Sequence, residues 1–93
     1  MAKKRILILG GGLAGLSAAW HLQKKGLICQ VFEKEPQVGG LCRSKKIGGF
    51  TFDCDGQLLH FKHRYVFRLV KDLLGDNLVK HKRSAWIYSS GRF

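Results

Sequence analysis

The stretch that decides the fold is residues 6–15, which read Ile-Leu-Ile-Leu-Gly-Gly-Gly-Leu-Ala-Gly. The aliphatic run from Ile6 to Leu9 predicts a short strand buried on both faces, as in a parallel sheet. Gly10, Gly12 and Gly15 follow at GxGxxG spacing. In that motif the first glycine permits a tight turn, the second lets backbone approach a pyrophosphate, and the third lets a helix pack closely on the strand.

The residues after the glycines predict a helix. We expect it to begin near Leu13, with Ala14 in its first turn, and to direct its free N–H groups and positive dipole end at phosphates. Gly26 is a typical C-terminal stop. The expected apolar face consists of Leu16, Ala18, Ala19, Trp20 and Leu22.

A second strand is expected from Ile28 to Phe32, with Glu33 at its tip. In a parallel strand-helix-strand unit, an acid at this place accepts a hydrogen bond from a ribose 2′-hydroxyl. Lys34 follows directly, and we include it among the cofactor-binding residues. Because strand, glycines, helix, second strand and acid stand in register, the segment predicts a dinucleotide-binding βαβ unit.

The same stretch permits another interpretation. Lys3, Lys4 and Arg5 precede fifteen uncharged residues that end near Ser17-Ala18-Ala19, a pattern that resembles a secretory signal peptide. Four glycines interrupt this apolar core, and it is shorter than the roughly 20 apolar residues that span a bilayer. We therefore favour dinucleotide binding.

A second glycine pair, Gly39-Gly40, is not part of the nicotinamide fingerprint. Two adjacent residues without side chains indicate another close approach of backbone to ligand. Arg43 and Ser44 follow, and their side chains could reach phosphate or ribose. This second motif favours FAD over NAD.

The two linked motifs carry a resemblance to a known family. They comprise residues 10–15 with Glu33, and then Gly39-Gly40-Leu41-Cys42-Arg43-Ser44, followed by residues 49–53. In them the chain resembles the N-terminal FAD-binding region of the amine oxidase, protoporphyrinogen oxidase and phytoene desaturase flavoproteins, whose clan includes UDP-galactopyranose mutase. The resemblance covers nearly the whole chain and specifies no substrate.

The resemblance implies where FAD binds. The adenosine ribose would lie at Glu33, and Gly40 with Leu41 would lie along the cofactor. Amine oxidases often have arginine at the position of Leu41, and here Arg43 stands two residues further on. The pyrophosphate would lie at Gly10, Gly12, Ala14 and Gly15.

The resemblance also implies an activity, hydride transfer from a C–N, C–C or C–O bond to the flavin of a complete FAD-dependent oxidoreductase. Two alternatives stay open, a mutase-like flavin isomerase acting on a nucleotide sugar and a non-catalytic truncated binding module. Family members tend to have Phe-Asp-x-Gly-Gly-His near the flavin, where this chain has Phe52-Asp53-Cys54-Asp55-Gly56-Gln57. Asp53, Asp55 and His60 are acid-base candidates, but we favour structural roles for them and assign no catalytic residue.

The remaining sequence predicts further elements. A hairpin is expected around Gly48-Gly49, with strands at residues 44–47 and 50–53. A helix is expected over Arg64 to Leu74, stopped by Gly75. Short strands are expected at residues 78–82 and 85–88, before a turn at residues 89–91.

Together these elements predict an α/β chain, a partial Rossmann-like FAD-binding βαβ unit followed by a hairpin, a helix and short strands. Parallel strands need cover on both faces, so we expect the fold to be incomplete without downstream sequence. Residues 1–93 are interpreted as the N-terminal FAD-binding segment of a larger two-domain flavoprotein. A downstream domain would bind a small-molecule substrate, and independent activity is not expected.

The chain is strongly basic, with a formal charge of +11. Such an excess suits nucleic acid, an anionic membrane surface or anionic small molecules. Residues 80–83, Lys-His-Lys-Arg, precede Trp86 and Tyr88, and cations beside aromatics can bind single-stranded nucleic acid. We favour a solvated strand pair here and expect no nucleic-acid partner.

The chain has three cysteines, Cys29, Cys42 and Cys54, and no CxxC pair. This usage fits a reducing, cytoplasmic setting. Peripheral attachment to a membrane surface stays open as an alternative location. Cys54 with His60 and His63 matches no zinc spacing. We expect no metal site, and we expect the two histidines to flank the start of a helix.

Overall fold

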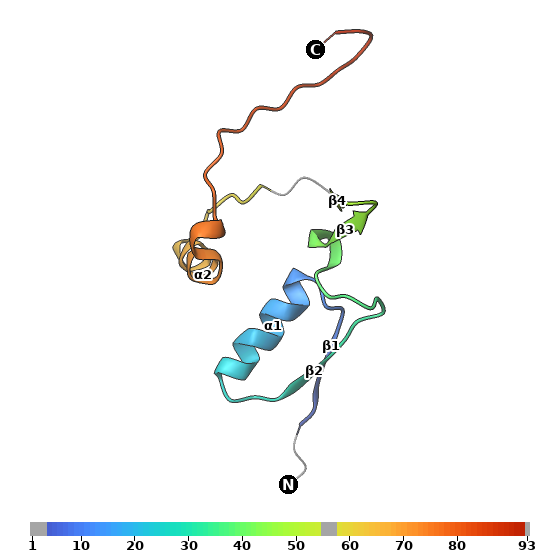
Figure 1. The fold of residues 1–93 in the computed structure, drawn as a ribbon. Helices are drawn as coiled ribbons and strands as arrows, with labels where there is room; N and C mark the ends of the chain where they lie inside the picture. Colours follow the sequence, from blue (N-terminus) through green and yellow to red (C-terminus); the bar gives the residue numbers. More distant parts are fainter. Residues whose placement is uncertain (1–3, 55–57, 93) are drawn as a thin grey trace. The chain divides into compact units, whose positions relative to one another are not determined.

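A computed structural model describes residues 4–54 and 58–92 (Figure 1). The chain divides into two compact units, Met1–Leu58 and Leu59–Phe93. The first unit contains a βαβ motif and a hairpin, and the second contains a helix followed by irregular chain. The described elements therefore mix helices and strands, as the α/β prediction requires.

The βαβ motif consists of β1 (Ile6–Leu9), α1 (Leu13–Lys24) and β2 (Cys29–Phe32). β1 and β2 pair in parallel, with Ile6 opposite Cys29 and Leu9 opposite Phe32. α1 packs against both strands. The predicted order and parallel pairing are confirmed, except that β2 begins at Cys29 rather than Ile28. Residues 6–20 thus form a strand, a glycine turn and a helix start rather than one continuous apolar helix.

β1 is covered on one face. Ile6 and Ile8 are half-buried, whereas Leu7 and Leu9 are 56% and 85% exposed. The prediction of a strand buried on both faces was wrong, because α1 covers one side of the two-stranded sheet and the alternating side chains of the other side reach solvent. Among the described residues, no hydrophobic side chain is fully buried.

The C-terminal end of α1 is a glycine stop. Gly26 has φ +76°, and its N–H donates to the Gln23 carbonyl while the Leu27 N–H donates to the Leu22 carbonyl. These two bonds form a Schellman motif, which confirms the predicted role of Gly26. The expected apolar face is narrower by one residue, because Ala18 is exposed. The half-buried members are Leu16, Ala19, Trp20 and Leu22.

The hairpin consists of β3 (Ser44–Ile47) and β4 (Phe50–Asp53), paired antiparallel as predicted. Gly48 and Gly49 connect them with φ of +55° and +83°. A two-residue turn of this kind needs positive φ at both positions, which suits glycine. Both strands lie open to solvent along their whole length.

The second unit contains α2 (Arg64–Leu74), the single-turn helix η2 (Gly75–Asn77) and the chain that follows. α2 has the predicted bounds, and Gly75 ends it with φ +53°. The predicted strands at 78–82 and 85–88 were wrong, since those residues have no regular structure. Residues of high strand propensity still need a partner strand, and no described strand pairs with them. The expected turn is present, with Ser89 and Arg92 bridged around Ser90-Gly91.

None of the helices in the described ranges has the length and apolar character needed to cross a membrane.

Candidate cofactor-binding site

The site begins where β1 ends. Gly10 has φ +107°, a conformation that side chains disfavour. Its N–H donates to the Phe32 carbonyl at 2.8 Å, so the pairing of the two strands continues one residue past β1. The chain then turns within Gly10–Gly12 and enters α1. The first glycine therefore permits the tight turn, as predicted.

Gly15 brings α1 close to the strand it follows. A Cβ atom on Gly15 would lie 2.0 Å from the carbonyl oxygen of Gly10 and 3.2 Å from Cγ2 of Ile8. The first distance is far inside van der Waals contact, so no other residue fits without moving the helix. The predicted role of the third glycine in helix-strand packing is confirmed.

The N-terminus of α1 is open. Gly12 is the residue before the helix, its extended backbone offers no side-chain cap, and no acidic residue stands in the first turn. The first backbone bond of this turn joins the Leu16 N–H to the Gly12 carbonyl at 2.9 Å. Leu13 and Ala14 in the first turn are exposed. The N–H groups and the positive dipole end are thus available to an anion.

Glu33, at the tip of β2, is tied to the glycine turn. Its Oε1 accepts the Gly11 N–H at 2.9 Å and its Oε2 accepts the Glu35 N–H at 3.0 Å. The Gly11 hydrogen bond, followed by that of Glu35, holds the pKa of the Glu33 carboxyl below its usual value. An ionised carboxylate has about four acceptor sites. Half-exposed Glu33 can therefore still accept a ligand hydroxyl.

The second glycine pair lies against the first glycine turn. The Gly39 N–H donates to the Gly11 carbonyl at 2.8 Å. A Cβ on Gly40 would lie 3.2 Å from the Cα of Gly12. The two glycine segments, each predicted to approach the ligand, therefore lie next to each other.

Gly11 is the residue that the sequence interpretation missed. It is buried, donates its N–H to Glu33 and accepts the Gly39 N–H. A Cβ at this position would lie 3.1 Å from Cγ1 of Val38 and 3.3 Å from Cβ of Glu33. The uninterrupted run Gly10–Gly12 was the available signal, since GxGxxG leaves its second position free.

The other predicted cofactor-binding residues differ in their exposure and in their hydrogen-bond partners. Half-buried Arg43 donates its Nε–H to the Gly40 carbonyl at 2.9 Å, which leaves the other guanidinium donors for a phosphate. Leu41, in the short helix η1 (Gly40–Cys42), is 76% exposed. The Ser44 hydroxyl donates to the Asp53 carboxylate. Lys34 is exposed beside Glu33.

The acid-base candidates Asp53 and His60 belong to different units of the chain. Asp53 ends β4 and holds the Ser44 hydroxyl, and exposed His60 belongs to the second unit. Asp55 lies outside the described residues, as do Gly56 and Gln57, which belong to the segment where the chain departs from the family motif.

The cysteines and His63 lie at separate places in the described chain. Cys29 is half-buried in β2, and Cys42 and Cys54 are exposed, all as free thiols. His63 is the residue before α2, and its carbonyl accepts the Phe67 N–H. No group of three or more metal-ligating side chains is found within residues 4–54 and 58–92.

A glycine turn between a parallel strand and an open helix N-terminus, with an acid at the tip of the next strand, defines a Rossmann-type dinucleotide-binding unit. Residues 8–73 match the family described as the NAD(P)-binding Rossmann-like domain, and the chain belongs to that family.

Several curated proteins are similar to the chain. A 1-hydroxycarotenoid 3,4-desaturase of Flavobacterium sp. is 42% identical over 60 residues, which cover 64% of this chain and 12% of the relative. A probable flavin-containing monoamine oxidase A of Dictyostelium discoideum is 37% identical over 68 residues, covering 73% and 15%. A 4,4'-diapolycopene oxygenase of Methylomonas sp is 35% identical over 78 residues, covering 84% and 15%.

These relatives confirm the resemblance to the amine oxidase and desaturase flavoproteins. The chain spans less than a sixth of the length of each of the three. No solved structure shows a significant match to the chain.

Proposed function

We propose that the chain binds FAD and is the N-terminal cofactor-binding segment of an amine-oxidase-like, FAD-dependent oxidoreductase. The observation that carries the proposal is the contact between the two glycine segments, Gly10–Gly12 and Gly39–Gly40. A ligand phosphate at the first segment would also lie beside the second, which the nicotinamide fingerprint lacks. The flavin-containing oxidase among the relatives supports the same cofactor.

The residues present suit the two halves of such a ligand. The pyrophosphate would bind at the open N-terminus of α1, since N–H groups and the helix dipole favour anions. The ribose hydroxyls of the adenosine would donate to Glu33, with Lys34 beside it. Along the cofactor would lie Gly40, Leu41, Arg43 and Ser44. The pyrophosphate residues would be Gly10, Gly12, Leu13, Ala14 and Gly15.

Each part of the chain would have a binding role rather than a chemical one. Bound FAD would supply the redox chemistry by accepting a hydride from a small-molecule substrate in the complete enzyme. Glu33 would orient the adenosine end, and Arg43 would hold Gly40 in position through its 2.9 Å bond to the Gly40 carbonyl. The substrate would be bound by a further domain of that enzyme.

Titration of the purified chain with FAD tests this function. We expect the flavin fluorescence to change on binding, and we expect added NAD⁺ to compete weakly. Glu33→Ala should weaken FAD binding at least about ten-fold, because the charge-assisted hydrogen bond to the ribose is lost together with the two that hold the Gly11 and Glu35 N–H groups. Glu35→Ala is the matched control, since Glu35 contributes its backbone N–H to the site and keeps it in the variant.

Two results would contradict the proposal. A chain that stays colourless and takes up no added FAD does not bind the cofactor on its own. Equal FAD affinity of Glu33→Ala and the unchanged chain would remove the ribose role of Glu33.

A further inference from the structure

The second unit carries an amphipathic helix with a basic face. Arg64, Arg68 and Lys71 recur at intervals of four and three residues, so they lie on one side of α2. The opposite side is apolar. Its members are Val66, Leu69, Val70, Leu73 and Leu74.

This apolar side remains largely open. Leu73 is 67% exposed, and Val66 and Leu74 are 42% and 41% exposed. Phe67 lies at the border with the basic face, where Phe61 packs edge-on against it with ring centroids 4.9 Å apart and Lys71 Nζ lies 5.9 Å from its ring centroid. Leu69 and Val70 are half-buried, so Val66, Leu73 and Leu74 are the part of this side that can enter an apolar medium.

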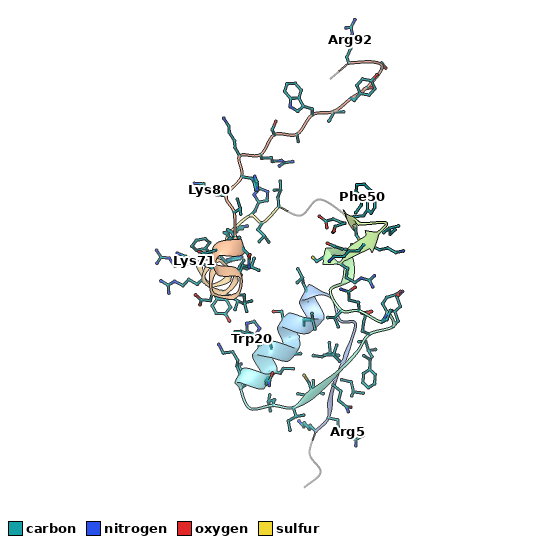
Figure 2. The ribbon with its side chains drawn as sticks, in the orientation of Figure 1. Arg5, Trp20, Phe50, Lys71, Lys80 and Arg92 are labelled. Carbon is teal, nitrogen blue, oxygen red and sulfur yellow. The ribbon has the colours of Figure 1, made fainter. Side chains whose placement is uncertain are left out.

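The segment after α2 has the same dual character. Lys80, Lys82 and Arg83 precede Trp86 and Tyr88, which are 74% and 63% exposed. From residue 59 onward the sequence contains eight Lys and Arg against two Asp. Figure 2 shows the side chains of α2 and of the extended segment, with Lys71 and Lys80 labelled. Both parts of the unit thus present cations together with large apolar groups.

We infer that residues 59–92 bind the surface of an anionic lipid bilayer, with α2 lying in the plane of the interface. A helix with a basic face, an apolar face and low overall hydrophobicity suits that position. Lipid phosphates and carboxylates complement the cations, while the acyl boundary covers the leucines and valines. Trp and Tyr favour the same depth, because their rings are apolar and carry a polar group.

A nucleic acid would complement the basic side of α2 but not its apolar side. Phosphates would neutralise Arg64, Arg68 and Lys71, and bases could stack on Trp86. The apolar side of α2 would stay in water. The bilayer accounts for the charge and the apolar exposure together.

Co-sedimentation of the 93-residue chain with lipid vesicles tests the inference, without FAD. We expect binding to vesicles of phosphatidylcholine with phosphatidylserine, and little binding to phosphatidylcholine alone. Binding should weaken as salt rises, since exposed charges are screened. Equal binding to both vesicle types, or no binding to either, overturns the inference.

Two triple variants distinguish binding through the basic face of α2 from binding through the net positive charge of the chain. Arg64→Gln, Arg68→Gln and Lys71→Gln together should lower the partition coefficient about 100-fold, because each cation near an anionic surface contributes about five-fold. Lys25→Gln, Lys45→Gln and Lys46→Gln together remove the same charge from the first unit and should change it by less than about three-fold. Equal losses in the two triple variants overturn the inference.

The apolar face is tested by Leu73→Gln, at a position that is 67% exposed. Vesicle binding should fall about ten-fold, as expected when one leucine no longer enters the acyl boundary. Unchanged circular dichroism confirms that α2 still forms. If Leu73→Gln has no effect and a single-stranded oligonucleotide binds the chain instead of vesicles, the partner is a nucleic acid and the inference is wrong.

Discussion

Gly40 lies directly against Gly12, and a Cβ on Gly40 would be 3.2 Å from the Cα of Gly12. The two residues are far apart in the sequence, and each belongs to a different glycine motif. Their contact joins the turn after β1 to the segment after β2. The adjoining hydrogen bond from the Gly39 N–H to the Gly11 carbonyl fixes the same approach.

The first prediction measures that contact by alanine substitution. Gly40 and Gly48 have nearly the same φ, +57° and +55°, but a Cβ on Gly48 would have no atom within 4 Å. Gly48→Ala should therefore lose only the left-handed backbone preference, about 1 kcal/mol. Gly40→Ala should lose about 1–2 kcal/mol more, because the methyl group meets Gly12.

Urea unfolding followed by circular dichroism gives both free energies of unfolding. FAD affinity should fall in Gly40→Ala and stay unchanged in Gly48→Ala. Equal stabilities of the two variants would show that the glycine segments do not touch.

The second prediction separates folding from binding within the first motif. Gly15→Ala places a methyl group 2.0 Å from the Gly10 carbonyl oxygen, so it should destabilise the chain by more than about 2 kcal/mol. Gly12→Ala meets its nearest atom at 3.9 Å and should cost less than about 1 kcal/mol. It should nonetheless weaken FAD binding at least about ten-fold, because a methyl group would stand where backbone approaches the pyrophosphate.

Circular dichroism and FAD titration distinguish the two variants. Retention of full FAD affinity by Gly12→Ala would remove the pyrophosphate role. A stable Gly15→Ala chain would show that α1 does not need its close approach to β1.

The third prediction concerns the pH dependence of stability at Glu33. The Gly11 and Glu35 N–H groups lower the pKa of this carboxyl below 4.5 in the folded chain. A lowered folded pKa means that ionised Glu33 stabilises the fold above pH 4.5, and that this contribution is lost as pH falls through the lowered value. Glu33→Gln should be less stable than the unchanged chain at neutral pH.

The difference between the two chains should narrow in acid. Urea unfolding at a series of pH values from neutral to well below 4.5 measures it. A difference that is the same at every pH would show that the charge of Glu33 does not contribute.

The fourth prediction tests the one-sided cover of β1. Leu7 is 56% exposed, so Leu7→Thr should cost less than about 0.5 kcal/mol. Ile8 is half-buried and faces Gly15 of α1, so Ile8→Thr should cost about 1–2 kcal/mol. Equal losses in urea unfolding would indicate that both faces of β1 are covered.

The elements that the sequence predicted correctly depend on neighbouring residues. β1 follows from an aliphatic run, the hairpin from Gly48-Gly49, and α2 from its helical periodicity closed by Gly75. Each signal is a local backbone preference, which acts over a few residues. The two strands predicted at 78–82 and 85–88 failed because strand formation depends on a partner, and no local pattern supplies one.

The candidate site, too, has features that the sequence predicted and one that it missed. The open helix start at Leu13, the close approach at Gly15 and the position of Glu33 after β2 agree with the motif. Gly11 was missed because its two hydrogen bonds reach Glu33 and Gly39, both distant in sequence. The GxGxxG spacing covers residues 10–15 only, so it cannot assign a contact to Glu33 or Gly39.

The sequence by itself therefore determined the βαβ unit and its glycine turn, because these follow from backbone preferences and spacing within residues 6–33. It also determined the family, through the two linked glycine motifs. Only the tertiary structure decided that β1 is covered on one face and that Gly39-Gly40 packs on Gly10–Gly12. Those features depend on the path of the chain between distant segments. Contacts between such segments form only when the first unit has folded.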